Sequence, residues 1–73
     1  MPRGTVRQWN DDDGWGVIDT DAAPGGIWTH FGVIRTNGYA TLNEGEQVEV
    51  EWEVGEQDGF NHRAISVIRA VGS

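Results

Sequence analysis

Apolar and polar residues alternate with a period of two along several short segments, a pattern that predicts β-strands rather than helices. The alternation is clearest in residues 46–54, where Val48, Val50 and Trp52 are separated by single glutamates. One face of this strand would lie in the core and the other in water, so Trp52 is expected in the core. Further strands are predicted over residues 4–10, 15–19, 27–31 and 63–69.

Turn-forming residues separate these strands, and eleven glycines in 73 residues leave little room for a long helix. The run Asp11-Asp12-Asp13-Gly14 predicts a tight turn between the first two strands. The longer connections are expected to be irregular: residues 20–26, 32–45 and 55–61. In the middle connection, we expect one helical turn near Gly32 to Ile34 and a turn at Asn37-Gly38. The pattern predicts one all-β domain over residues 1–73, a small five-stranded antiparallel barrel without exposed edges.

Strand parity decides which aromatic side chains face water. If Ile18 and Ile27 point into the core, the neighbouring rings on these two strands point outward. These rings are Trp15, Trp28 and His30. Exposed rings on adjacent strands would form a flat surface on which nucleic-acid bases stack. The alternative is the inverted parity, with the two tryptophans in the core and the two isoleucines in water.

Composition and charge change this picture in opposite directions. Five arginines against twelve acidic residues give a formal net charge of −7. Such a chain repels polyphosphate at long range, which disfavours tight nucleic-acid binding. Four tryptophans, in contrast, are more aromatic surface than so small a core readily hides. Binding by stacking, with few phosphate contacts, is compatible with both observations.

Several classes of protein are excluded by length and composition. A chain of 73 residues cannot form a two-domain enzyme, and without cysteine it has no disulfide, iron–sulfur cluster or thiol nucleophile. Its longest apolar stretches are two or three residues, far too short for a membrane span or a signal peptide. These features favour a soluble protein of the cytoplasm with no membrane partner.

Metal and catalytic sites are not predicted. The aspartate-rich turn before Gly14 is similar to a calcium loop, but Trp9 and Thr20 occupy the first and twelfth positions, which require carboxylates. His30 and His62 do not have the spacing of metal ligands. Nucleophilic catalysis would have serine and threonine hydroxyls but no supporting base beside them. We therefore expect no metal, no cofactor and no enzymatic activity.

Four motifs together resemble the bacterial cold-shock protein family. They are Gly4-Thr5-Val6-Arg7, Trp9-Asn10, Asp13-Gly14-Trp15-Gly16-Val17-Ile18 and Ile27-Trp28-Thr29-His30-Phe31. Their order and spacing match the family pattern Gly-x-Val-Lys-Trp-Phe-Asn, Lys-Gly-Phe-Gly-Phe-Ile and Val-Phe-Val-His-Phe, and the likeness covers essentially the whole chain. The resemblance implies an oligonucleotide-binding barrel that binds single-stranded RNA and DNA through an aromatic face on its first three strands.

The resemblance also implies roles for individual residues. Stacking roles fall on Trp15, Trp28, His30 and Phe31, and edge roles on Tyr39 and Arg7. Arg7 is the cation best placed to meet a phosphate. For His30, the alternative is an ordinary surface histidine.

Three positions depart from the family pattern. Gln8 stands where the family has a stacking tryptophan, Asp13 where it has a basic residue and Val17 where it has an exposed phenylalanine. Trp9 is adjacent to the first departure, but parity turns it toward the opposite face. Phe60, in the loop before the last strand, either restores a stacking ring or covers one end of the barrel.

Two functions therefore remain open from the sequence. The first is a single-strand nucleic-acid binder of modest affinity that acts as an RNA chaperone. The second is a protein-interaction module on the same barrel, with a basic protein as its partner, because the chain is acidic and its stacking surface is reduced. In both cases we expect a monomer or a weak dimer.

Overall fold

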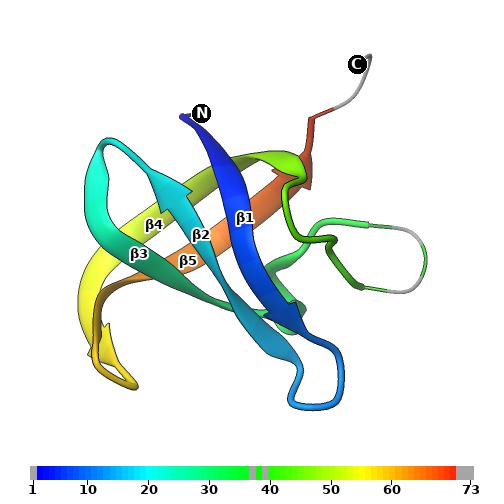
Figure 1. The fold of residues 1–73 in the computed structure, drawn as a ribbon, viewed down its shortest axis with the longest axis horizontal. Coiled ribbons are helices and arrows are strands. Elements are labelled where there is room, and N and C mark those ends of the chain that lie inside the picture. The colour runs from blue at the N-terminus through cyan, green and yellow to red at the C-terminus, as the bar shows by residue number, and fades with distance from the viewer. Residues whose placement is uncertain (1, 37, 39, 71–73) are drawn as a thin grey trace.

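A computed structural model describes residues 2–36, 38 and 40–70. Within these residues the chain forms five strands and one short 3₁₀ helix (Figure 1). They are β1 (Arg3–Asn10), β2 (Trp15–Thr20), β3 (Ala23–His30), η1 (Phe31–Val33), β4 (Gln47–Gln57) and β5 (Phe60–Arg69). The strands close into a barrel in the order β1-β2-β3-β5-β4, which confirms the predicted all-β barrel. None of the helical structure in this part of the chain could reach across a membrane.

The strand pairs are antiparallel except for one. β3 and β5 run in parallel, with Ile27 opposite His62 and Trp28 opposite Arg63. A closed barrel with an odd number of strands cannot alternate direction at every junction. The parallel pair is therefore a geometric consequence of closure. It places β5 next to β3, the strand that carries Trp28 and His30.

The connection between β2 and β3 is shorter than the sequence predicts. Only Asp21 and Ala22 separate the two strands, instead of a loop over residues 20–26. Gly25 and Gly26 lie inside β3 with φ angles of 96° and 99°, which side chains other than glycine rarely adopt. In the sequence these two glycines suggest a loop. In the structure they allow β3 to continue through backbone angles that other residues rarely adopt.

The predicted loop over residues 55–61 is also wrong in extent. β4 continues to Gln57 and β5 begins at Phe60, so the connection is the two-residue turn Asp58-Gly59. Both turn residues have positive φ, 52° and 89°, as tight β-hairpins require. The alternation pattern does not predict this hairpin, because the facing ends of β4 and β5 are polar and lack the alternation of a half-buried strand.

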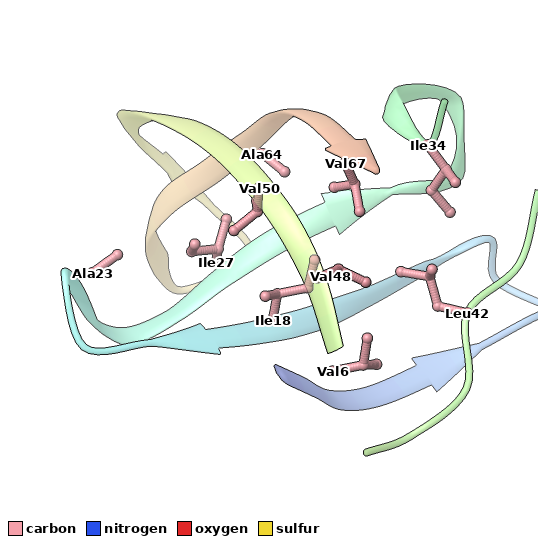
Figure 2. Close-up of a cluster of buried hydrophobic side chains, with 10 residues drawn as sticks. All are labelled: Val6, Ile18, Ala23, Ile27, Ile34, Leu42, Val48, Val50, Ala64 and Val67. Atoms are coloured by element: carbon pink, nitrogen blue, oxygen red, sulfur yellow. The ribbon is translucent and has the colours of Figure 1, made fainter. Parts of the chain in front are cut away.

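Small aliphatic side chains fill the barrel. They are Val6, Ile18, Ala23, Ile27, Ile34, Leu42, Val48, Val50, Ala64 and Val67 (Figure 2). Ile34 and Leu42 come from the segment between η1 and β4, so the long connection contributes to the core. Thr29 is also buried, and its hydroxyl donates to the carbonyl of Ile27 over 3.1 Å.

Trp52 packs against this core but is only partly buried. The register between β4 and β5 shifts next to it, so that Glu51 pairs with Ser66 and Trp52 with Ala64, leaving Ile65 as an extra residue. Such a bulge re-aims the neighbouring side chains. The strict alternation of the sequence therefore places Trp52 deeper in the core than the structure does.

Candidate nucleic-acid interface

Among the described residues, four aromatic rings follow one another on the outer face of the barrel, where β2 and β3 meet η1. The ring centroids of Trp15 and Trp28 lie 6.0 Å apart, and the ring planes differ by 25°. The centroids of Trp28 and His30 are also 6.0 Å apart, and those of His30 and Phe31 are 4.4 Å apart. These four residues, the ring row, form a π surface of the kind on which unpaired bases stack.

The strand register turns the ring row toward solvent. Trp15 lies opposite His30 across β2 and β3, whereas Ile18 lies opposite Ile27. Both isoleucines are fully buried, while the tryptophans of the row are half-buried and His30 is exposed. The predicted parity is confirmed, and the inverted arrangement is excluded.

Phe31 joins the row because β3 ends just before it. Strand parity alone would turn this ring inward, but the chain enters η1 at Phe31, and 46% of the residue is exposed. Its N–H donates to the carbonyl of Gly14 over 2.9 Å. A Cβ on Gly14 would stand 2.9 Å from Cδ1 of Phe31, closer than side-chain atoms normally approach. Glycine at position 14 therefore allows Phe31 to lie against the β1–β2 turn.

His30 is oriented by a local hydrogen bond. Its Nδ1 accepts from the backbone N–H of Gly32 over 3.1 Å. An accepting nitrogen carries no proton, so the neutral ring holds its proton on Nε2. This bond fixes the imidazole between Trp28 and Phe31 and leaves Nε2–H as a donor.

Arg7 lies beside the ring row but is paired with an acid. Its Nε donates to the two Asp19 carboxylate oxygens over 2.9 and 3.1 Å, and its Nη2 donates over 2.5 Å. Hydrogen bonding within the pair lowers the pKa of Asp19 and raises that of Arg7. Both groups therefore stay ionised with their charges balanced. The sequence suggests a cation placed to meet a phosphate here, and the structure pairs this cation with Asp19.

Two of the other four arginines are also paired with acids. Arg63 pairs with Glu53 over 2.7 Å and Arg69 with Glu46 over 2.9 Å. Arg35 donates to the Ser66 hydroxyl over 3.4 Å, and no acidic partner for it is found among residues 2–36, 38 and 40–70. In the part of the chain that the structure describes, three of the five arginines belong to ion pairs.

The three aspartates after β1 form the predicted turn. Asn10 Oδ1 accepts from the backbone N–H groups of Asp12 and Asp13 over 3.0 and 3.1 Å. The Asp11 carboxylate accepts from the Trp9 indole over 2.7 Å. Across residues 2–36, 38 and 40–70, no group of three or more His, Asp or Glu side chains could hold a metal ion.

One departure from the family pattern, Gln8, leaves a depression beside the ring row. Gln8 is exposed, and together with Trp9 and Trp15 it lines a surface depression of about 260 Å³. Trp9 does not fill this depression, because its ring crosses over Gly16 and packs against the core. A Cβ on Gly16 would stand 2.4 Å from Cε3 of Trp9. Trp9 thus takes the opposite face, as parity predicts.

Two candidate residues are not joined to the row. Phe60 is a half-buried residue at the start of β5, and no aromatic contact to it is found among the described residues. Tyr39 lies outside the described residues, as does Asn37 of the expected turn. The sequence interpretation also misses Asp19 as part of the site. The alternation in β2 contains the signal, because it places Asp19 on the same face as Trp15.

Comparison with known proteins agrees with this architecture. Residues 2–70 match the "Cold-shock" DNA-binding domain family. The chain is 39% identical over 57 residues to the major cold shock protein of Streptococcus pyogenes serotype M1, covering 78% of this chain and 84% of that protein. It is also 39% identical over 49 residues to the cold shock-like protein CspE of Escherichia coli K12, covering 67% of this chain and 71% of that protein.

Proposed function

Because the chain belongs to the cold-shock DNA-binding domain family, we propose that it binds single-stranded RNA and DNA by stacking unpaired bases on the ring row. Family membership also places it among nucleic-acid-binding domains rather than enzymes. The observation that carries the proposal is the continuous run of rings from Trp15 to Phe31. Tyr39 and Phe60 are additional stacking candidates at the margin of the surface.

The proposed binding is modest in strength and quickly reversible. Each stacked base contributes about 1–3 kcal/mol, while a chain of net charge −7 gains little from phosphate attraction. A binder of this kind keeps RNA segments unpaired and then releases them. We therefore propose that the protein acts as an RNA chaperone in the cytoplasm.

Tryptophan fluorescence tests this function directly. Titration with a single-stranded oligonucleotide should quench the emission, because bases stack on Trp15 and Trp28. A hairpin duplex of the same composition should quench much less, since its base faces are hidden within the stack. Equal affinity for both forms would contradict binding by base stacking.

A second candidate function rests on the other side of the barrel. Ile65 and Ile68 of β5 are 44% and 38% exposed, and Glu49 and Glu51 lie on the neighbouring strand β4. An apolar surface edged by carboxylates suits a basic protein partner, or weak dimerisation of an otherwise monomeric chain. Sedimentation at high protein concentration tests self-association, which the Ile65→Lys substitution should abolish. NMR titration with a lysine- and leucine-rich peptide tests the basic partner, and an absence of shifts on β4 and β5 would reject it.

A further inference from the structure

Two irregular positions on neighbouring strands meet on the outer face, next to the ring row. The pairing of β1 with β2 shifts between Val6 and Gln8, so Arg7 is an extra residue. The pairing of β2 with β3 shifts between Ile18 and Thr20, where the single residue Asp19 faces the three residues 24–26 of β3. Bulges of this kind re-aim side chains. Here they bring one arginine and one aspartate together on the solvent side.

The guanidinium of Arg7 lies over Gly26, and the Val17 side chain lies beside the same glycine. Val17 is fully buried, although it lies on the outer face and outside the core cluster. Gly26 has no side chain, and a Cβ there would stand 3.0 Å from Nη2 and 3.4 Å from Cζ of Arg7, and 2.7 Å from Cγ1 of Val17. The guanidinium therefore occupies the space that a side chain at position 26 would fill.

The Arg7–Asp19 pair flanks the ring row next to Trp28. Val17 lies directly opposite Trp28 across β2 and β3, and Gly26 precedes Trp28 by two residues on β3. The Arg7 side chain is 43% exposed, so a ligand can reach it from solvent. The Asp19 carboxylate balances the charge of Arg7 and fixes the orientation of its guanidinium plane. Bases stack on guanidinium planes as they do on aromatic rings.

We infer that the Arg7–Asp19 pair is a further stacking position for an unpaired nucleobase, in which Arg7 contacts the base and Asp19 positions Arg7. The inference rests on the proposed single-strand binding and adds one base to the strand that the ring row holds. It also assigns Arg7 a role different from that of a phosphate-binding cation. The two roles predict different effects for the same substitutions.

The first test compares Asp19→Asn and Arg7→Lys by titration with a short oligothymidylate. If the pair stacks a base, both variants should bind about five- to tenfold more weakly. Asp19→Asn loses the carboxylate that orients Arg7, and Arg7→Lys loses the planar guanidinium. If Arg7 instead binds phosphate, Asp19→Asn should bind more tightly with a steeper salt dependence, and Arg7→Lys should bind normally. Glu51→Gln, on the opposite side of the barrel, removes the same charge and should leave affinity unchanged.

The second test separates the base from its phosphate. Abasic residues placed one at a time along the oligothymidylate remove a base and keep the backbone. At one position, the abasic substitution should weaken binding by the wild-type protein but have little further effect on Arg7→Lys. Additive losses at every position would overturn the inference. Failure of the proposed function itself looks different, since Trp28→Ala would then bind all these oligonucleotides like the wild type.

Discussion

At the scale of single residues, glycines decide where the aromatic side chains can lie. Gly14 makes room for Phe31, and Gly16 makes room for Trp9. The glycine pattern is visible in the sequence, but the ring that each glycine faces is not, because these contacts join different strands. The outward orientation of Trp15 and Trp28 is predictable, since the buried isoleucines fix the parity of both strands.

Gly16→Ala should strongly destabilise the barrel. The new Cβ would stand 2.3 Å from the backbone carbonyl oxygen of Gln8 and 2.4 Å from the Trp9 ring, so the strands would have to separate. Overpacking of this kind costs about 1–3 kcal/mol or more. Thermal unfolding measures the loss. Gly38→Ala is the matched control, because nothing lies within 4 Å of its Cβ position. A melting temperature equal to that of the control would refute the packing of Trp9 over β2.

Gln8→Trp should strengthen single-strand binding. The new ring would occupy the depression of about 260 Å³ beside Trp15 and add stacking area without adding charge. The gain, about 1–3 kcal/mol, should therefore be similar at low and high salt. Fluorescence titration at two salt concentrations measures it. No gain at either concentration would mean that the strand does not pass over this part of β1.

At the scale of elements, alternation predicts the strands whose two faces differ, and it fails where bulges or polar strand ends occur. The first half of β4 is predicted well because Val48 and Val50 alternate with polar residues, and β2 is predicted to within one residue although Val17 and Ile18 are both buried. The alternation does place Asp19 on the outer face, but the register shifts next to Arg7, Asp19 and Ile65 leave no mark in it. The contact between Arg7 and Asp19 and the shallow position of Trp52 therefore could not be derived. The hairpin at Asp58-Gly59 does carry a sequence signal, the Asp-Gly pair.

The Arg7–Asp19 pair should contribute to stability in a pH-dependent way. The pKa of Asp19 is lowered in the folded state by hydrogen bonding to Arg7, so its contribution is present above the ordinary value of 3.8 and lost as pH falls through the folded pKa. Asp19→Asn should therefore destabilise the protein slightly at pH 7 and hardly at all near pH 2. Urea unfolding at both pH values measures the difference. An equal effect at both would contradict an ionised pair.

At the scale of the whole molecule, charge is arranged so that little of it is left to attract phosphate. Ion pairs occupy Arg7, Arg63 and Arg69, while the net charge remains −7. Under the proposed function, the affinity for single strands comes instead from the ring row, which the closed barrel holds in register. This combination differs from a nucleic-acid binder that works by electrostatic attraction.

Salt should accordingly have a small effect on binding. Arg3 and Arg35 are the arginines for which no ion pair is found among the described residues. Two phosphate contacts would give a slope of log affinity against log salt of about −1.4 for single strands. We expect a slope no steeper than this in titrations between low and high salt. A slope of about −3 or steeper would show that phosphate contacts dominate.

The central claim is that the ring row holds unpaired bases, and the affinity of Trp28→Ala for single strands tests it most directly. Trp28 lies between Trp15 and His30, so its removal interrupts the surface without touching the buried isoleucines behind it. Binding should weaken by about 1–3 kcal/mol while the circular dichroism spectrum stays that of the barrel. Trp52→Ala, which alters a tryptophan of β4, should lower stability and leave affinity unchanged. Wild-type affinity in a folded Trp28→Ala protein would contradict the account.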